Sequence, residues 1–334
     1  MSKIKLAING FGRIGRLTFR TLLNHPDVEI VAVNDLTDNY TLAHLLRYDS
    51  AHGRFKFDVV ANESSLFVDK IPVKVLKEPR PEKLPWKELD IDVVIESTGR
   101  FTTPDDLRLH IQAGARKVLL SAPAKGEVKT IVMGINDRDL SAGDQIISNA
   151  SCTTNCLAAL ASVLHEKFGI EKGYMTTIHA ITADQRLQDA PHKDLRRARA
   201  ASHNIVPTST GAARAIGLVL PDLKGRLDGT AMRVPVLDGS ITELNCLLSI
   251  EATVLEINNQ FLYASEDGPL KGILQFTDEP LVSSDIIGNP SSCIFDSKLT
   301  MAMGKLVRVT GWYDNEWGYS NRLAELAIRL GQMN

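Results

Sequence analysis

The glycine-rich stretch GFGRIG at residues 10–15 constrains the fold more than any other part of this 334-residue sequence. The apolar run KLAIN at 5–9 precedes it and predicts a β-strand, and RLTFRTLLN at 16–24 has the apolar spacing of a helix. A second strand-like run, EIVAVND, follows at 29–35. A strand, a glycine-rich turn, a helix and a second strand in this order are typical of a dinucleotide-binding βαβ unit.

The residue types in this unit suit a nucleotide ligand. Gly10, Gly12 and Gly15 allow a tight turn, a close approach of the backbone to a pyrophosphate, and close packing of helix on strand. The helix N-terminus offers N–H groups and a favourable dipole to the anion. Asp35 ends the second strand, where a carboxylate binds the ribose 2′-hydroxyl and repels a 2′-phosphate, so NAD is favoured over NADP. A glycine-rich turn with a helix-capping aspartate is the alternative without a ligand.

The rest of the chain predicts two domains, as its length also suggests. Residues 1–150 alternate strand and helix patterns and predict an α/β domain of the doubly wound Rossmann type, completed by a C-terminal helix within 316–334. Residues 151–315 carry longer strands and fewer helices, which predicts an α+β domain with a large, mostly antiparallel sheet. The runs behind these predictions are strands at 92–98, 117–122, 130–136, 145–149, 175–182 and 240–251, and helices at 105–115, 212–220 and 321–330.

Composition excludes several classes of protein. A net charge of -2 argues against a dedicated nucleic-acid partner, and the apolar runs are shorter than the ~20 residues of a membrane span. Residues 1–9 are too short and too polar for a signal peptide, so a cytoplasmic location with reduced thiols is expected. The four cysteines lack C-x-x-C spacing and are too few for a disulfide framework, and no metal site is expected.

Cys152 lies in SNASCTTNCLAAL (148–160), where a polar run enters a helix that is expected to begin near residue 153. The free N–H groups and dipole of a helix start stabilise a thiolate, so we expect a lowered pKa for Cys152. Ser151, Thr153 and Thr154 are expected to cap the helix. A small buried cysteine capped by hydroxyl side chains is the alternative. The other cysteines, Cys156, Cys246 and Cys293, are expected in apolar packing.

A thiolate nucleophile needs a base, and His179 is the candidate. It lies among apolar and threonine residues at the end of the strand expected at 175–182. The residues around His179 leave two roles equally open, a catalytic base and a core histidine whose hydrogen bonds are satisfied. The remaining histidines lie mostly in polar contexts that are typical of a surface, namely His25, His52, His110, His165 and His192.

Basic residues are concentrated within the polar segment 183–206, which shows no periodicity. The run HKDLRRARA at 192–200 includes Arg197 and would usually be a solvated charged face. A small phosphorylated substrate would also suit it, because the arginine fork binds phosphate oxygens in pairs. TSTG at 208–211 opens a helix, and Arg233 lies in an apolar run and needs a partner. Two anion sites beside one thiolate would fit a phosphorylated substrate plus free phosphate.

Five motifs in sequence order resemble the phosphorylating glyceraldehyde-3-phosphate dehydrogenase family along essentially the whole chain. They are INGFGRIGR at 8–16, YDSAHGRF at 48–55, SNASCTTNCLA at 148–158, DAPHKDLRRARAA at 189–201 and WYDNEWGYSNR at 312–322. The resemblance implies NAD-dependent oxidation of glyceraldehyde 3-phosphate with inorganic phosphate, in glycolysis or gluconeogenesis. It implies Cys152 as the nucleophile that forms a thiohemiacetal and a thioester, and His179 as the base.

The resemblance also implies the binding residues. Those for the cofactor would be Gly10, Gly12, Arg13, Ile14, Gly15, Asp35, Ser121, Asn315 and Tyr319. Thr182 and Arg233 would bind the substrate's phosphate. The attacking phosphate would bind at Ser151, Thr153, Arg197, Thr210 and Gly211.

The basic segment 183–206 would line the neighbouring subunit's cofactor site in a homotetramer, where Pro191 offers no donor to a 2′-phosphate. Erythrose-4-phosphate dehydrogenase is the nearest alternative, since it shares the fold and the cysteine. A catalytically idle binding protein is the alternative from another class. The retained Cys152, His179, Arg233 and Asn315 argue against an idle protein.

Overall fold

The structure, a computed structural model, describes residues 3–333, which form two units. The first unit comprises the residues up to Ile131, Asp139–Ala150 and the residues from Ser320 on. The second comprises Val132–Arg138 and Ser151–Tyr319. Among the described residues, no helix combines the length and apolarity that a membrane span requires.

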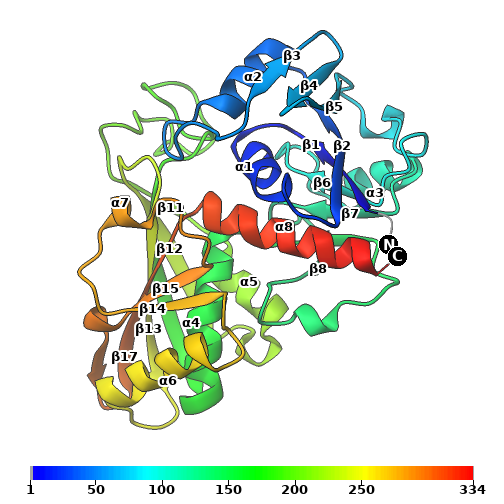
Figure 1. Ribbon diagram of the computed structural model, residues 1–334. Coiled ribbons are helices and arrows are strands. Elements are labelled where there is room, and N and C mark those ends of the chain that lie inside the picture. Colours follow the sequence, from blue (N-terminus) through cyan, green and yellow to red (C-terminus); the bar gives the residue numbers. More distant parts are fainter. Residues whose placement is uncertain (1–2, 334) are drawn as a thin grey trace. The chain divides into compact units, whose positions relative to one another are not determined.

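A nine-stranded sheet forms the centre of the first unit, with the strand order β3-β4-β5-β2-β1-β6-β7-β9-β8 (Figure 1). Neighbouring strands from β5 to β8 are parallel, whereas β3, β4 and β5 pair antiparallel at one edge. The helices are α1 (Arg13–Leu22), α2 (Asn39–Arg47) and α3 (Pro104–Gln112). The strands are β1 (Ile4–Asn9), β2 (Val28–Asn34), β3 (Val59–Ala61), β4 (Ser65–Val68), β5 (Ile71–Leu76), β6 (Val93–Glu96), β7 (Lys117–Leu120), β8 (Lys129–Thr130) and β9 (Ile146–Ser148).

Local sequence explains why these elements begin where they do. The strands β6 and β7 are buried along their whole length, as expected for parallel strands with both faces covered. The helix α3 starts with Pro104 at its first position and a capping box in which Thr103 and Asp106 bond each other's backbone. These features end the connecting loop and fix the direction of the helix.

The strand predicted at 130–136 is wrong beyond its first residue, because β8 ends at Thr130. Two local features turn the chain after that point. The Asn136 side chain accepts a hydrogen bond from the Val132 backbone N–H at 2.8 Å, and Gly134 has φ +79°. A side chain that bonds the nearby backbone, together with a left-handed glycine, replaces the ladder of a strand by a turn.

An eight-stranded sheet forms the second unit, with the order β11-β12-β10-β13-β17-β15-β14 and with β16 paired to β17. The pairs β10–β12 and β14–β15 are parallel and the others are antiparallel. Its strands are β10 (Ile170–His179), β11 (Val206–Ser209), β12 (Leu227–Arg233), β13 (Ser240–Leu248), β14 (Leu274–Thr277), β15 (Cys293–Asp296), β16 (Met301–Met303) and β17 (Leu306–Tyr313). The helices are α4 (Cys152–Phe168), α5 (Ala212–Val219), α6 (Val254–Glu266) and α7 (Ser283–Ile286). The last helix, α8 (Trp317–Gln332), begins in this unit and continues in the first.

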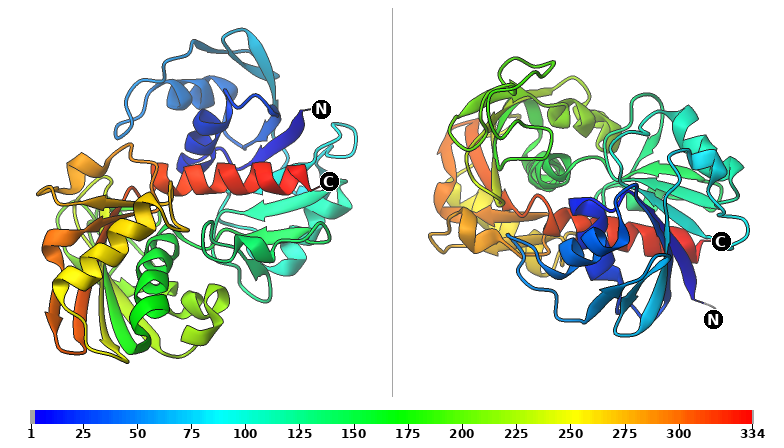
Figure 2. Two further views of the ribbon diagram at one scale, coloured as in Figure 1. Left: turned by 60° about the horizontal axis from the view of Figure 1, so that its bottom comes forward. Right: turned by 90° about the horizontal axis from the view of Figure 1, so that it is seen from above.

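The helix α4 is the core element of the second unit. It packs on β13, β15 and β17 and contacts α5 and α6, and Figure 2 shows α4 and α6 against the same sheet. Most of its side chains are buried, so its apolar composition extends around the helix. The Phe261 and Phe295 rings stack with centroids 3.8 Å apart where α6 meets β15. The predicted combination of a Rossmann-type domain and an α+β domain with a mostly antiparallel sheet is confirmed.

Candidate active site

Cys152 is the first residue of α4, one position before the start that the sequence predicts. Ser151 is the N-cap, and its side-chain oxygen accepts a hydrogen bond from the Thr154 backbone N–H at 3.0 Å. Ala150 precedes the cap with φ 56°. This left-handed conformation costs a residue other than glycine about 1–2 kcal/mol, and such strain is concentrated at functional sites.

The parallel register of β10 and β12 places His179 directly opposite Arg233 at the ends of the two strands. The Nε2 atom of His179 lies 3.5 Å from the Sγ atom of Cys152. On the other side of the ring, Nδ1 lies 2.8 Å from the carbonyl oxygen of Ala180 and 2.6 Å from Nη1 of Arg233. The three side chains therefore form a continuous line from thiol to imidazole to guanidinium within the second unit.

The expected lowering of the Cys152 pKa is wrong. Burial raises the pKa of this thiol to about 11, and it outweighs the opposing effects of the Arg233 charge and the Thr153 hydrogen bonds. Burial and then the Arg233 charge lower the pKa of His179 to about 3. At neutral pH both groups are uncharged, so the site holds a thiol beside a neutral imidazole.

The Thr153 hydroxyl lies between the thiol and the core, at 4.0 Å from the Sγ atom of Cys152. The same hydroxyl lies 2.9 Å from the Tyr313 hydroxyl, which is also 2.8 Å from the Thr177 hydroxyl. Tyr313 is buried, and burial raises its pKa. Tyr313 was not predicted as a site residue, although it lies within the motif at 312–322. Its hydroxyl fixes Thr153, the residue after the cysteine.

Among the basic residues at 192–200, Arg197 turns toward the segment before α5. Its Nε atom donates to the Thr208 hydroxyl at 2.9 Å, and Nη2 donates to the Ser209 carbonyl oxygen at 3.4 Å. Gly211 is the N-cap of α5, and the Thr210 hydroxyl accepts from the Ala212 N–H at 3.2 Å. The structure therefore places the Arg197 guanidinium beside residues 208–211, as an anion site formed by both would require.

Asp184 was missed by the sequence analysis. Its carboxylate accepts hydrogen bonds from the Thr182 hydroxyl and from Nη1 of Arg197, the latter at 2.5 Å. The available signal was a lone carboxylate two residues after Thr182, at the beginning of a basic loop.

A pocket of the first unit opens at the carboxyl ends of β1, β2 and β6, where open α/β sheets bind ligands. Gly10 has φ +91°, and a Cβ atom there would lie 2.5 Å from the Thr98 nitrogen. A Cβ on Gly15 would lie 2.2 Å from the Gly10 carbonyl oxygen, whereas Gly12 faces open space. The lining residues are Asn9, Gly10, Gly12, Asn34, Asp35, Leu36, Glu78, Pro79, Ser97, Thr98, Arg100 and Phe101.

Comparisons with known proteins agree with this geometry. A family model described as "Glyceraldehyde 3-phosphate dehydrogenase, NAD binding domain" matches residues 4–104, and its C-terminal-domain counterpart matches 151–315. The glyceraldehyde-3-phosphate dehydrogenase of Streptomyces coelicolor is 59% identical over 331 residues, which is 98% of either chain. That of Mycobacterium tuberculosis is 56% identical over 336 residues, covering 98% of this chain and 99% of the relative. The chain belongs to the glyceraldehyde-3-phosphate dehydrogenase family.

As a member of this family the chain is an NAD-dependent oxidoreductase, and the pocket of the first unit fits that cofactor. The carboxylate of Asp35 is held at the pocket by backbone N–H groups of Phe11 at 2.8 Å and Thr37 at 3.0 Å. Gly12 is the N-cap of α1 and has no side chain to cap its first turn. The amide groups of that turn and the Asp35 carboxylate have the chemistry that a pyrophosphate and a ribose require.

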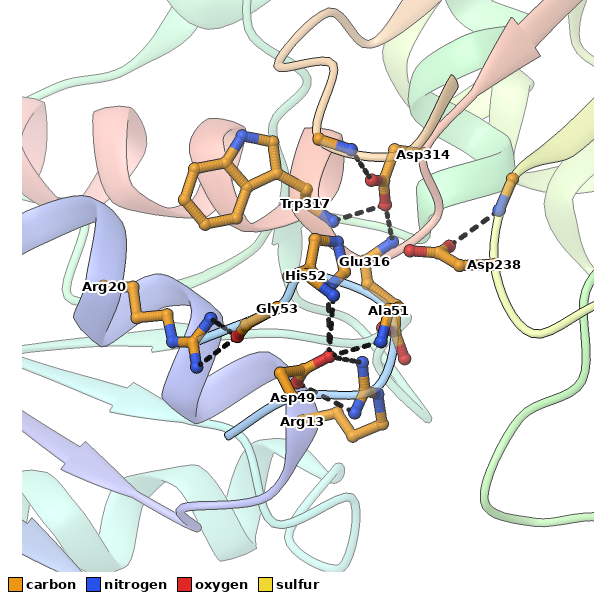
Figure 3. A network of polar contacts seen from close by, with 12 residues as sticks. Arg13, Arg20, Asp49, Ala51, His52, Gly53, Asp238, Asp314, Glu316 and Trp317 are labelled. Carbon is orange, nitrogen blue, oxygen red and sulfur yellow. Dashed lines mark hydrogen bonds and ion pairs between the residues drawn. The ribbon is translucent and has the colours of Figure 1, made fainter. Parts of the chain in front are cut away.

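The other residues that the family resemblance assigned to the cofactor have partners of their own. The guanidinium of Arg13 forms two hydrogen bonds with the Asp49 carboxylate, at 3.0 and 3.1 Å, so its side chain supports the loop at 49–53 (Figure 3). Ile14 lies in the first turn of α1, and Ser121 follows β7, where its N–H donates to the Glu96 carbonyl oxygen at 3.0 Å.

Asn315 lies two residues before α8, and Tyr319 lies in the first turn of that helix. The Oδ1 atom of Asn315 accepts from the Ser240 hydroxyl at 2.6 Å, and Tyr319 is buried. The neighbouring Asp314 accepts from the N–H groups of Glu316 at 2.9 Å and Trp317 at 2.6 Å, as Figure 3 shows. These contacts fix the first turn of α8 and the orientation of the Asn315 side chain.

His110 was expected at the surface, and that expectation is wrong, because the residue is completely buried. Trp86 donates to its Nδ1 atom at 3.0 Å, so Nε2 carries the proton and donates to Glu96 at 3.0 Å. Glu96 accepts from Asn9 at 2.5 Å, and Asn9 in turn accepts from Asn34 at 2.7 Å. In this family member, a buried polar chain thus supports two residues that line the cofactor pocket.

Proposed function

We propose that the chain oxidises D-glyceraldehyde 3-phosphate with NAD and inorganic phosphate to 1,3-bisphosphoglycerate, as a cytoplasmic enzyme of glycolysis or gluconeogenesis. One observation carries this proposal: the Cys152 thiol, the His179 imidazole and the Arg233 guanidinium form a line with spacings of 3.5 and 2.6 Å. A nucleophile, a base and an anion-binding cation are the groups that oxidation of a phosphorylated aldehyde through a thioester needs.

The first step is addition of the Cys152 sulfur to the aldehyde carbon, while its proton passes to Nε2 of His179. This transfer needs a neutral imidazole, and the low pKa of His179, about 3, provides one. Nε2 must also be free of a proton. Nδ1 must then carry the proton and donate to the Ala180 carbonyl oxygen, 2.8 Å away, which requires that Arg233 no longer donates to Nδ1. His179 then gives this proton to the former aldehyde oxygen, so the product is a thiohemiacetal on Cys152 beside a neutral imidazole.

The second step converts the thiohemiacetal into a thioester. His179 takes the hydroxyl proton as the C–H hydride leaves, and NAD, when bound, accepts that hydride. The thioester retains the reactivity that a carboxylate would lack, so an oxygen of inorganic phosphate can displace the Cys152 sulfur and release the acyl phosphate.

Two anion sites are assigned to the two phosphates. Thr182 and Arg233 bind the phosphate of the substrate, which the position of Arg233 beside His179 supports. The attacking phosphate binds at Ser151, Thr153, Arg197, Thr210 and Gly211. The contacts of Arg197 with Thr208 and Ser209 support this second set, because they bring its guanidinium to the start of α5.

We also propose a homotetramer in which the loop at 183–206 lines the cofactor site of a neighbouring subunit. Large apolar side chains of this loop are exposed, with Leu187 at 78%, Leu195 at 81% and Ile205 at 69%. Apolar residues gathered on one exposed segment favour a protein partner. Native mass spectrometry of the purified protein tests the assembly, and a monomer at micromolar concentration would contradict it.

NADH formation from glyceraldehyde 3-phosphate, with and without inorganic phosphate, tests the reaction. We expect rapid NADH formation only with phosphate. Faster turnover of erythrose 4-phosphate, independent of phosphate, would identify erythrose-4-phosphate dehydrogenase instead. Absence of NADH from either aldehyde would indicate an idle homologue.

A further inference from the structure

The carboxylate of Asp184 bridges the two proposed anion sites. One oxygen accepts from the Thr182 hydroxyl, which belongs to the proposed substrate-phosphate site, and the other accepts from Nη1 of Arg197 at 2.5 Å. Each of these donors is a group that a phosphate oxygen would use. Asp184 therefore bonds the same hydrogen atoms as the ligands that the proposed function assigns to this place.

Two of the three nitrogen atoms of Arg197 have partners other than Asp184. An anion would therefore bind Arg197 at the place that the Asp184 carboxylate occupies. Nε is bonded to the Thr208 hydroxyl, and Nη2 is directed at the Ser209 carbonyl oxygen. Nε also lies 3.6 Å from the Asp194 carboxylate, whereas Nη1 donates directly to the Asp184 carboxylate at 2.5 Å. A phosphate that binds the Nη1 group must displace the carboxylate or share the hydrogen bond with it.

Asp184 is ionised at neutral pH. Burial opposes its ionisation, but the Thr182 hydrogen bond and the charges of Arg197 and Arg233 outweigh burial and lower the Asp184 pKa. The side chain is 42% exposed and that of Arg197 is 21% exposed. Exposed ion pairs of this kind are weak, so a doubly charged phosphate can compete with the carboxylate.

We propose that Asp184 is a built-in competitor for phosphate, a specificity-determining residue whose carboxylate occupies Thr182 and Arg197 and sets how tightly they bind anions. This inference rests on the proposed function for the identity of the two anions. It assigns to Asp184 a role that opposes binding, in contrast to every other residue of the two sites.

The variant Asp184→Asn tests this role, because asparagine keeps the shape and the acceptor for Thr182 and removes the charge. We expect its KM for inorganic phosphate to fall about 1.5-fold to fivefold, the range that corresponds to an exposed ion pair. The value of kcat should change less than KM. The Kd for inorganic phosphate, measured by calorimetry on the NAD-bound enzyme, should fall in parallel.

Asp189→Asn is the matched control, since Asp189 lies in the same loop and pairs with Arg199 at 2.7 Å. It removes the same charge from the loop without touching Thr182 or Arg197. An equal fall of the phosphate Kd in both variants would attribute the effect to net charge and overturn the proposal. An unchanged or raised Kd in Asp184→Asn would overturn it as well.

Two further measurements keep this inference separate from the proposed function. If Asp184→Asn folds poorly, as thermal unfolding would reveal, Asp184→Ser removes the carboxylate with a smaller side chain and carries the same expectation. If Arg197→Ala raises the phosphate KM while the Asp184 variants change nothing, the proposed function stands and the competitor role fails. If wild-type NADH formation ignores phosphate, the proposed function fails, and the calorimetric Kd still decides the role of Asp184.

Discussion

Nη1 of Arg233 lies 2.6 Å from Nδ1 of His179, on the side of the ring away from Cys152. A guanidinium can only donate, so at this distance Nδ1 is the acceptor and the ring proton is on Nε2, facing the thiol. The His179 base needs the opposite tautomer. We expect the substrate's phosphate to draw Arg233 away, after which Nδ1–H donates to the Ala180 carbonyl oxygen and Nε2 becomes the proton acceptor.

This relationship predicts that a phosphate monoester without an aldehyde, such as glycerol 3-phosphate, moves the His179 proton from Nε2 to Nδ1. Nitrogen NMR of protein labelled with [15N]histidine distinguishes the two tautomers, and the His179→Asn spectrum assigns the signals. Arg233→Met should show the Nδ1–H form without any ligand, because methionine has no N–H group to donate to Nδ1. Identical wild-type spectra with and without the monoester would contradict the coupling.

The low pKa of His179 predicts a specific dependence of stability on pH. The pKa of His179 in the folded protein, about 3, lies below the ordinary histidine value of 6.5. Between these two pH values the unfolded chain therefore binds a proton that the folded chain does not. Stability is fully present above the unfolded pKa and falls as the pH drops toward the folded pKa. The slope reaches about 1.4 kcal/mol per pH unit for this one proton.

His179→Gln should lose that slope, since glutamine does not titrate. Urea unfolding of both proteins at several pH values between 6.5 and 3 measures it. His192→Gln is a useful control, because its imidazole lies in the loop and is not buried. Equal pH slopes in wild type and His179→Gln would show that His179 ionises normally in the folded state.

Substitution by serine should affect activity strongly at Cys152 and weakly at Cys156. Cys152→Ser should abolish NADH formation, because serine is a far weaker nucleophile beside the same base. Cys156→Ser should keep most of the activity: Cys156 is completely buried, and its thiol donates to the Gly311 carbonyl oxygen at 3.7 Å. Substantial turnover in the Cys152 variant would refute the proposed mechanism.

Iodoacetamide should label Cys152 first, with peptide mass spectrometry as the measurement. Among the four cysteines Cys152 is partly exposed, whereas Cys156, Cys246 and Cys293 are buried. Burial also raises the pKa of Cys246 to about 12. Faster labelling of any buried cysteine would contradict this order.

The sequence predicts the order of turns, strands and helices well, because glycine turns and apolar runs depend on residues that are close in the chain. The turn at 10–15, the helix beside Cys152 and the strand that ends at His179 are all fixed by their own neighbours in the chain. The features that were missed depend on contacts between distant residues. Burial reverses the expected pKa shift of Cys152, and the Trp86 and Glu96 partners of His110 lie 24 and 14 residues away.

Asp184 shows a second reason why a site residue could not be predicted from the sequence. Its hydrogen bond to Thr182 is local, but its partner Arg197 is 13 residues further along a loop without periodicity. A pattern of residue types can show that a loop is basic, whereas the pairing of one carboxylate with one of the loop's five lysine and arginine residues depends on the folded path of the backbone.

The environment of Asp35 predicts the choice between NAD and NADP. Both carboxylate oxygens accept backbone N–H groups, from Phe11 and Thr37, so the charge is held in place at the pocket. The next residue, Leu36, is 57% exposed and offers no donor to an added phosphate. At ~4 Å and an effective dielectric constant near 20, the repulsion between this carboxylate and one charge of a 2′-phosphate is about 4 kcal/mol before screening.

Asp35→Asn tests this repulsion, because asparagine retains an oxygen for the backbone N–H of Phe11 and removes the charge. We expect wild type to prefer NAD strongly by kcat/KM, and the variant to lose at least tenfold of that preference, which corresponds to about 1.4 kcal/mol. Asp27→Asn removes an exposed charge of the same unit that does not line the pocket, and it should leave the ratio unchanged. If Asp35→Asn and Asp27→Asn shift the NAD-to-NADP ratio equally, the fixed carboxylate at the pocket does not set the cofactor choice.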